Sequence, residues 1–209
     1  QYWNVKSTSE VKEISDTDRI HISLPLYHKN AMSMMKMIFF VGASAVVLPK
    51  VDPEAILSSI EAHRCTFMTG VPALYRMVIN HMITNEDRKY DLKSLRFAFC
   101  GSSDTPVELL EEIHQRMGIE VYEGYGLTEG GPIVSASRKG EQRQGSAGKP
   151  VPGCSIKIVN EDGKPVKTRE IGELWVKNPG VTQGYWNLPE VSAKRITSDG
   201  WLKTGDAVW

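Results

Sequence analysis

Short apolar runs alternate with helical stretches between residues 19 and 135, and this alternation constrains the fold more than any other feature of the sequence. Strands that alternate with helices are typical of a mostly parallel sheet with helices on its faces. Residues 95–100 are apolar without polar alternation, which predicts a strand buried on both faces. The predicted strands are 19–26, 45–48, 65–68, 95–100 and 119–122, and the predicted helices are 31–41, 52–63, 72–82 and 105–117.

Two helix starts carry recognisable signals. Asp52 precedes Pro53, which is the pattern of an N-cap followed by proline at the first helical position. Thr105 and Glu108 have the spacing of a capping box, so the helix over 105–117 is predicted to open there. Residues 1–18 are polar and show no signal peptide.

The composition changes at Ser137. Residues 137–153 are polar and rich in glycine, which indicates a loop or linker. Shorter segments follow, with turn signals at 161–163 and 199–200, strands at 154–160 and 172–177, and a short helix at 189–196. We therefore predict an α/β subdomain over residues 1–136 and a small antiparallel, barrel-like β subdomain over residues 137–209.

Charge and cysteine content narrow the class of partner. Lys plus Arg and Asp plus Glu number 25 each, so net charge gives no reason to expect nucleic acid or an anionic membrane. The three cysteines form no CxxC pair and four of the histidines show no metal-ligand spacing, which speaks against a zinc or disulfide framework. The most apolar run, 32–47, is too short and polar to span a bilayer. A reducing, cytoplasmic compartment fits these features.

Residues 121–132 carry the strongest chemical signal. A predicted strand runs into a loop with four glycines, Thr128 and Glu129. Glycines allow a ligand to approach the backbone, and backbone N–H groups with a hydroxyl can bind phosphate oxygens. Glu129 can supply a hard oxygen ligand for Mg²⁺, and Tyr125 can lie against a purine. The loop is a candidate nucleotide site, and the alternative is a tight surface turn with a solvated glutamate.

Seven segments in the same order resemble the adenylate-forming superfamily, which includes acyl-CoA synthetases, peptide-synthetase adenylation domains and firefly luciferase. Residues 125–129, YGLTE, are similar to its YGxTE signature. The others are PLYH at 25–28, GSS at 101–103, GSAGKPVPG at 145–153, GELWV at 172–176, GYWNLPE at 184–190 and WLKTGD at 201–206. The resemblance covers nearly the whole chain.

The resemblance implies roles for the nucleotide-binding residues. Glu129 should hold Mg²⁺, Thr128 a phosphate oxygen, and Tyr125 should stack on adenine. Asp206 should accept hydrogen bonds from both ribose hydroxyls, because a carboxylate has the acceptor capacity for that contact. The implied nucleotide-binding set is Gly101, Ser102, Ser103, Glu123, Gly124, Tyr125, Gly126 and Asp206. Ser102 and Ser103 depart from the family, which has Gly and Ala there.

The resemblance also implies an acyl site. His28 should lie where the acyl and thiol channels meet, and its alternative is an ordinary histidine at a helix start. Gly70, Val71 and Pro72 should line the acyl pocket. The apolar segment 32–40 suggests a channel for a medium- or long-chain fatty acid, and its alternative is core packing of a methionine-rich helix.

The implied reaction has two steps, with Thr128, Glu129 and His28 as the catalytic set. A carboxylic acid and ATP give acyl-AMP and pyrophosphate with Mg²⁺, and the thiol of coenzyme A then gives a thioester and AMP. A Ser/Thr/Gly-rich phosphate loop ending in PKG and a C-terminal domain with a catalytic lysine do not occur in the sequence, so this chain alone is expected not to turn over.

Three alternatives stay open. The first is a carrier-protein-loading adenylation domain, which shares the first step but uses another thiol. The second is a non-catalytic nucleotide-binding module. A dinucleotide oxidoreductase is less favoured, because Gly124, Gly126 and Gly130 have a spacing one residue too long for the fingerprint and no helix is predicted to follow.

Overall fold

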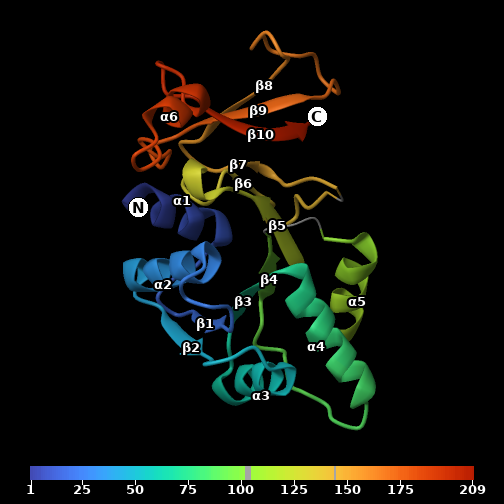
Figure 1. The fold of residues 1–209 in the computed structure, drawn as a ribbon. Helices are drawn as coiled ribbons and strands as arrows, with labels where there is room; N and C mark the ends of the chain where they lie inside the picture. The colour runs from blue at the N-terminus through green and yellow to red at the C-terminus, as the bar shows by residue number, and fades with distance from the viewer. Residues whose placement is uncertain (102–104, 144) are drawn as a thin grey trace.

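The computed structural model of the protein describes residues 1–101, 105–143 and 145–209. Its described part contains a larger sheet with helices on both faces and, at one end, a smaller antiparallel sheet (Figure 1). The predicted fold class is therefore confirmed. None of the described helices combines the length and the apolar character that crossing a membrane requires.

The larger sheet is built from β1 (Arg19–Ile22), β2 (Ser44–Val47), β3 (Phe67–Gly70), β4 (Phe97–Cys100), β5 (Val121–Tyr125), β6 (Ser135–Ala136) and β7 (Lys149–Pro150). Within the described residues these seven strands follow the order β2-β1-β3-β4-β5-β6-β7. The first five pair in parallel, and β6 and β7 continue the sheet in antiparallel pairing. The loop after β5 thus leaves the carboxyl end of a parallel strand, where α/β sheets bind ligands.

Five helices pack on this sheet in the described chain: α1 (Tyr2–Lys12), α2 (Lys29–Val41), α3 (Pro53–His63), α4 (Pro72–Thr84) and α5 (Val107–Met117). Phe67, Phe97 and Phe99 pack on the side of α1 and α2, whereas Met68 and Ala98 pack with α3, α4 and α5. Successive strand residues point to opposite faces, so β3 and β4 are buried on both. This confirms the prediction made from the uninterrupted apolar run at 95–100.

The strand predicted at 65–68 is shifted, because β3 begins at Phe67. The preceding helix ends at Arg64 in the left-handed conformation, with φ of 51°. The Cys65 N–H donates back to the Ile60 carbonyl at 3.1 Å, so Cys65 belongs to the helix end. Local backbone bonding therefore delays the strand by two residues relative to the apolar pattern.

One predicted helix start is confirmed and one is wrong. Asp52 Oδ1 accepts the Ala55 N–H at 2.9 Å and caps α3. The capping box predicted at Thr105 does not form, since Pro106 is the N-cap of α5 and no side chain caps that helix. Thr105 lies one position too early, and its hydroxyl donates instead to Cys100 Sγ at 3.3 Å.

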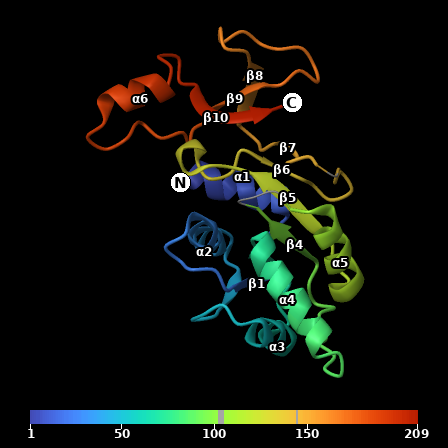
Figure 2. The ribbon, with the colours of Figure 1, turned by 45° about the vertical axis from the view of Figure 1, so that its right-hand side comes forward.

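Helix α1 forms in a segment for which the sequence predicts no element. Its side chains are polar, but Trp3 Nε1 donates to the Pro152 carbonyl at 3.1 Å and Asn4 Nδ2 to the Gly131 carbonyl at 2.5 Å. The helix lies between α2 and the region of β6 in both views (Figures 1 and 2). Tertiary hydrogen bonds therefore stabilise a helix that lacks an apolar stripe.

The smaller sheet contains β8 (Ser155–Val159), β9 (Gly172–Lys177) and β10 (Leu202–Val208), and α6 (Pro189–Arg195) lies in the β9–β10 connection. The three strands are antiparallel in the order β10-β9-β8, and Figure 2 shows this sheet and α6 above the α/β body. The division predicted between residues 136 and 137 falls inside the larger sheet, because β7 pairs with β6.

Candidate functional site

The loop after β5 is shaped by close backbone contacts. It contains a short 3₁₀ turn, η1 (Thr128–Gly130), which begins within the YGLTE segment. A Cβ atom added to Gly126 would lie 1.8 Å from the Pro132 carbonyl oxygen, so only glycine fits the present path. Gly131 has a φ of 78° and approaches Gly180 of the β9–β10 connection. These glycines bring the loop against the smaller sheet.

Two carboxylates that the sequence singled out are held by tyrosines across this contact. Tyr125 Oη donates to Asp206 Oδ2, and Tyr185 Oη donates to Glu129 Oε1 at 3.0 Å. The backbone of Glu129 is fixed as well, because its carbonyl accepts the Thr182 N–H at 2.8 Å. The structure therefore brings the YGLTE loop, the GYWNLPE segment and the TGD segment together.

The phenol of Tyr125 acts as a donor in this arrangement. Burial, together with the hydrogen bond to Asp206, raises the pKa of Tyr125, so the phenol stays protonated at neutral pH. The two residues are 81 positions apart in sequence, and no motif signals their pairing. Sequence reasoning assigned Tyr125 to adenine stacking and missed this second contact.

Asp206 lies on a bulge in β10. The pairing with β9 shifts between Lys203 and Ala207, and Gly205 adopts a φ of 79°. Thr204 Oγ1 donates to the Leu174 carbonyl at 2.7 Å and accepts the Asp206 N–H at 3.1 Å. β-Bulges re-aim side chains next to active sites. The TGD tripeptide thus forms an ordered turn that directs an exposed carboxylate toward Tyr125.

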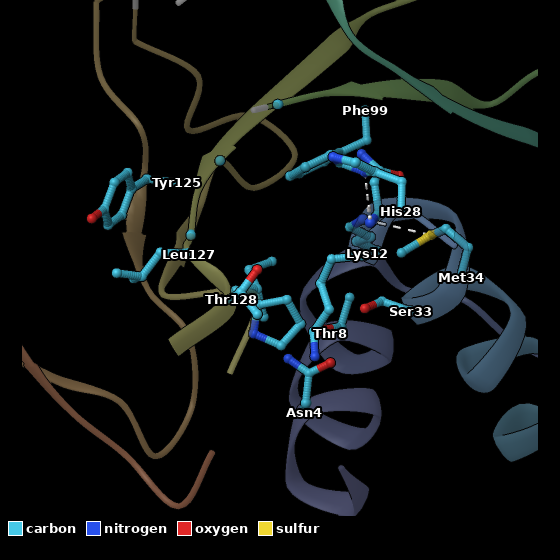
Figure 3. A pocket seen from close by; sticks show the side chains of 17 residues that line it. Asn4, Thr8, Lys12, His28, Ser33, Met34, Phe99, Tyr125, Leu127 and Thr128 are labelled. Carbon is cyan, nitrogen blue, oxygen red and sulfur yellow. Dashed lines mark hydrogen bonds between the residues drawn. The ribbon is translucent and has the colours of Figure 1, made fainter. Parts of the chain in front are cut away.

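A cavity of about 270 Å³ lies between α1 and α2 on one side and the carboxyl ends of β4 and β5 on the other (Figure 3). Its lining includes six residues predicted for the site: His28, Gly101, Gly124, Tyr125, Gly126 and Thr128. His28 and Thr128 are exposed, so they belong to the part of the wall that meets solvent. The cavity adjoins the loop that carries Glu129.

His28 stands at a helix start, which was the alternative considered for it, and its place where acyl and thiol channels meet stays a prediction. It is the N-cap of α2, where its Nδ1 accepts the Asn30 N–H at 3.3 Å. It also lines the cavity, as Thr128 does (Figure 3). The hydrogen bond to Asn30 orients the imidazole.

The remaining predicted residues lie elsewhere. Gly70 ends β3, Val71 is the N-cap of α4 and Pro72 begins that helix, and none of the three is among the described residues that line the cavity. Glu123 lines a second cavity of about 310 Å³ beside α5, on the other side of β5. Ser102 and Ser103 lie outside the described residues.

The apolar segment 32–40, for which a channel was predicted, lies within α2, and its residues face different surroundings. Ser33 and Met34 of α2 line the cavity, whereas Met37 and Ile38 are buried in the core. Phe39 is exposed and points away from the core. Met37 and Ile38 therefore serve core packing, the alternative considered for this segment, and the channel stays a prediction.

Sequence reasoning missed one wall of the cavity. Asn4, Thr8 and Lys12 of α1 recur every four residues, share one helix face and are all buried. Desolvation by burial lowers the pKa of the Lys12 ammonium to about 7. The four-residue spacing was a signal of a shared face, but polar residues at that spacing usually face solvent.

The described residues contain no group of three or more His, Cys, Asp and Glu side chains that could hold a metal by themselves. Mg²⁺ is commonly bound through one or two carboxylates together with substrate phosphates. Glu129, with one oxygen held by Tyr185, fits that kind of incomplete site.

Comparison with known proteins places these features in a family. The family model of the AMP-binding enzymes matches residues 1–186, and the chain belongs to this family. It is 36% identical over 207 residues to indoleacetate–CoA ligase from Aromatoleum aromaticum, covering 98% of this chain and 40% of the relative. It is 36% identical over 186 residues to a long-chain-fatty-acid–CoA ligase from Bacillus subtilis, covering 88% and 32%.

Solved structures agree with the sequence relatives. Apo MatB from Rhodopseudomonas palustris matches with a TM-score of 0.89 at 28% identity, covering 99% of this chain and 40% of that one. O-succinylbenzoate coenzyme A synthetase from Bacillus subtilis, in complex with ATP and magnesium ion, matches with a TM-score of 0.86 at 29% identity, covering 99% and 42%. The chain thus spans about one third to two fifths of the length of these relatives.

Proposed function

We propose that the protein to which this chain belongs is an AMP-forming acid–CoA ligase. The observation that carries the proposal is the joining of the YGLTE loop to the TGD turn, with Glu129 and Asp206 held beside a cavity that could receive an acid. The named relatives above support a CoA ligase over other adenylate-forming enzymes, because they include ligases for indoleacetate and for fatty acids.

The first step joins the acid to AMP. A carboxylate oxygen attacks the α-phosphorus of ATP, the bond from that phosphorus to the bridging oxygen breaks, and pyrophosphate leaves with its electron pair. Asp206 binds the ribose hydroxyls, which supplies binding energy remote from the reacting atoms. Thr128 donates its hydroxyl to a phosphate oxygen. Glu129 would hold Mg²⁺, which when bound would supply neutralisation of phosphate charge.

The second step forms the thioester. The sulfur of coenzyme A attacks the acyl carbon and the thiol proton passes to solvent, while the bond from the acyl carbon to the phosphate oxygen breaks and AMP leaves with its electron pair. His28 is exposed, lines the cavity and has its ring oriented by the Asn30 N–H, which supports a role for it beside an entering thiol. The second step is where a carrier-protein thiol could replace coenzyme A.

The acid is proposed from the size of the cavity. Pockets for small molecules usually measure roughly 300–1,000 Å³, and a cavity of about 270 Å³ favours a compact acid. The medium- or long-chain fatty acid expected from the sequence stays a prediction, and a panel of acids that includes both kinds decides between them.

The test uses the full-length protein. Acid-dependent exchange of pyrophosphate into ATP is measured over aromatic, short, medium, long-chain and amino acids, for the wild type and for Glu129→Gln. The matched control is Glu161→Gln, an exposed glutamate of the β8–β9 turn. We expect Glu129→Gln to lower exchange on the order of 100-fold and the control to leave it unchanged.

Consumption of coenzyme A by each active acid then separates the candidates. Thioester formation supports the ligase, and exchange without it favours a carrier-loading adenylation domain. Nucleotide binding without exchange for any acid would instead support a non-catalytic module. The expectation that the 209-residue chain alone does not turn over is tested in the same assay.

A further inference from the structure

Lys12 is a lysine without an anionic partner inside the cavity. It ends α1, and the residue is only 3% exposed. Its Nζ lies 3.7 Å from the centre of the Phe99 ring and 3.9 Å from Met34 Sδ (Figure 3). None of the ion pairs in the described chain involves Lys12.

These neighbours are poor substitutes for water around an ammonium group. An aromatic face and a thioether attract a cation weakly, whereas burial of an unpaired charge is strongly unfavourable. Desolvation accordingly lowers the pKa of Lys12 to about 7. An ammonium group has three donors, and the thioether of Met34 accepts one of them. The buried end of the cavity therefore offers donors that the described protein leaves without an oxygen acceptor.

The cavity has two chemically different ends. Thr128 is exposed and is followed by Glu129 of the proposed metal site, so under the proposed function the reacting carboxylate belongs beside Thr128. Lys12 is buried and lines the same cavity from α1. A bound acid whose carboxylate reacts beside Thr128 therefore extends its other end toward Lys12.

We propose that Lys12 is a specificity-determining residue for a carboxylic acid that carries a second oxygen able to bear negative charge, a carboxylate or a phenol, at the end remote from the reacting carboxylate. This inference rests on the proposed ligase function and names its substrate class. The second oxygen accepts hydrogen bonds from the Lys12 ammonium group. A plain alkyl or phenyl tail would leave that group buried and unpaired.

The experiment uses the full-length protein and matched acids that differ in the distal group. Hexanedioate is compared with hexanoate, and 4-hydroxyphenylacetate with phenylacetate, by kcat/KM for pyrophosphate exchange. Wild type is compared with Lys12→Met, which keeps the length of the side chain and removes its donors. The control is Lys6→Met, an exposed lysine of the same helix that does not line the cavity.

We expect wild type and Lys6→Met to prefer the acid with the distal oxygen in at least one pair, on the order of 10- to 100-fold. Lys12→Met should abolish or reverse that preference while leaving the KM for ATP unchanged. The pair that responds distinguishes a carboxylate from a phenol.

The proposal is overturned if wild type prefers the unsubstituted acid in both pairs, a result that needs no variant to fold. It is also overturned if Lys12→Met lowers kcat/KM equally for both members of each pair. Absence of exchange with every acid in the wider panel would refute the ligase function itself, which is a different outcome from exchange without a distal preference.

Discussion

Replacing Lys12 by Met should change how the stability of the protein depends on pH. The ordinary lysine pKa of 10.5 applies to the unfolded chain, and burial lowers the value in the folded state to about 7. Between these two values the unfolded chain binds one proton more than the folded chain, so stability rises with pH. Below pH 7 both states are protonated, and the full cost of the buried charge is present.

The magnitude follows from the same two values. At 1.36 kcal/mol per pKa unit, the interval from 10.5 to about 7 corresponds to a cost of about 5 kcal/mol below pH 7. Between pH 7 and pH 9, loss of the proton from folded Lys12 removes about 2 kcal/mol of this cost. Met carries no charge and fills nearly the same space beside Met34 and Phe99. The unfolding free energy of Lys12→Met should therefore not show this rise between pH 7 and pH 9.

The assay is urea unfolding of the full-length wild type, Lys12→Met and Lys6→Met at pH 7 and pH 9. The difference in unfolding free energy between Lys12→Met and wild type should favour the variant at pH 7 and should shrink by about 2 kcal/mol at pH 9. Lys6→Met should follow wild type at both values. A difference that stays constant with pH would refute the reasoning, because it would mean that Lys12 keeps its proton on folding without cost.

Three further predictions concern other sites in the full-length protein. Asp206→Asn should raise the KM for ATP in the exchange assay on the order of 10-fold, since a hydrogen bond to a charged acceptor is lost; an unchanged KM would remove Asp206 from the ribose site. Gly126→Ala should lower the unfolding free energy in urea by about 1–3 kcal/mol, because its Cβ would meet the Pro132 carbonyl. A variant as stable as wild type would contradict the path described for this loop. Burial lowers the pKa of His21 to about 4 from 6.5, so stability should fall as pH decreases from 6.5 to 4, by up to about 3 kcal/mol. His21→Gln should flatten this dependence in melting experiments, and an equally steep fall in the variant would refute it.

The parts of the fold that could be predicted are those that local sequence determines. The apolar runs located all five parallel strands, and Asp52 marked a real helix start. The glycine-rich loop after β5 was recognised because its residue types are unusual together. Its path also depends on a close approach to Gly180, which is distant in sequence.

The parts that could not be predicted depend on contacts between distant segments. Helix α1 lacks an apolar stripe, and its polar residues are buried against the loop after β5. The contact between Tyr125 and Asp206 joins residues 81 positions apart. The capping box predicted at Thr105 fails because of a local competition: the sulfur of the neighbouring Cys100 accepts the hydroxyl that would have capped the helix.

The tyrosines that hold Asp206 and Glu129 have a thermodynamic consequence for nucleotide binding. Each of these carboxylates has a phenolic donor in place of part of its hydration. Under the proposed function, a ribose hydroxyl would reach Asp206 without the carboxylate first shedding a complete water shell, because Tyr125 already fixes its position. Less side-chain entropy is then lost on association, so the affinity reflects preorganisation as well as contact.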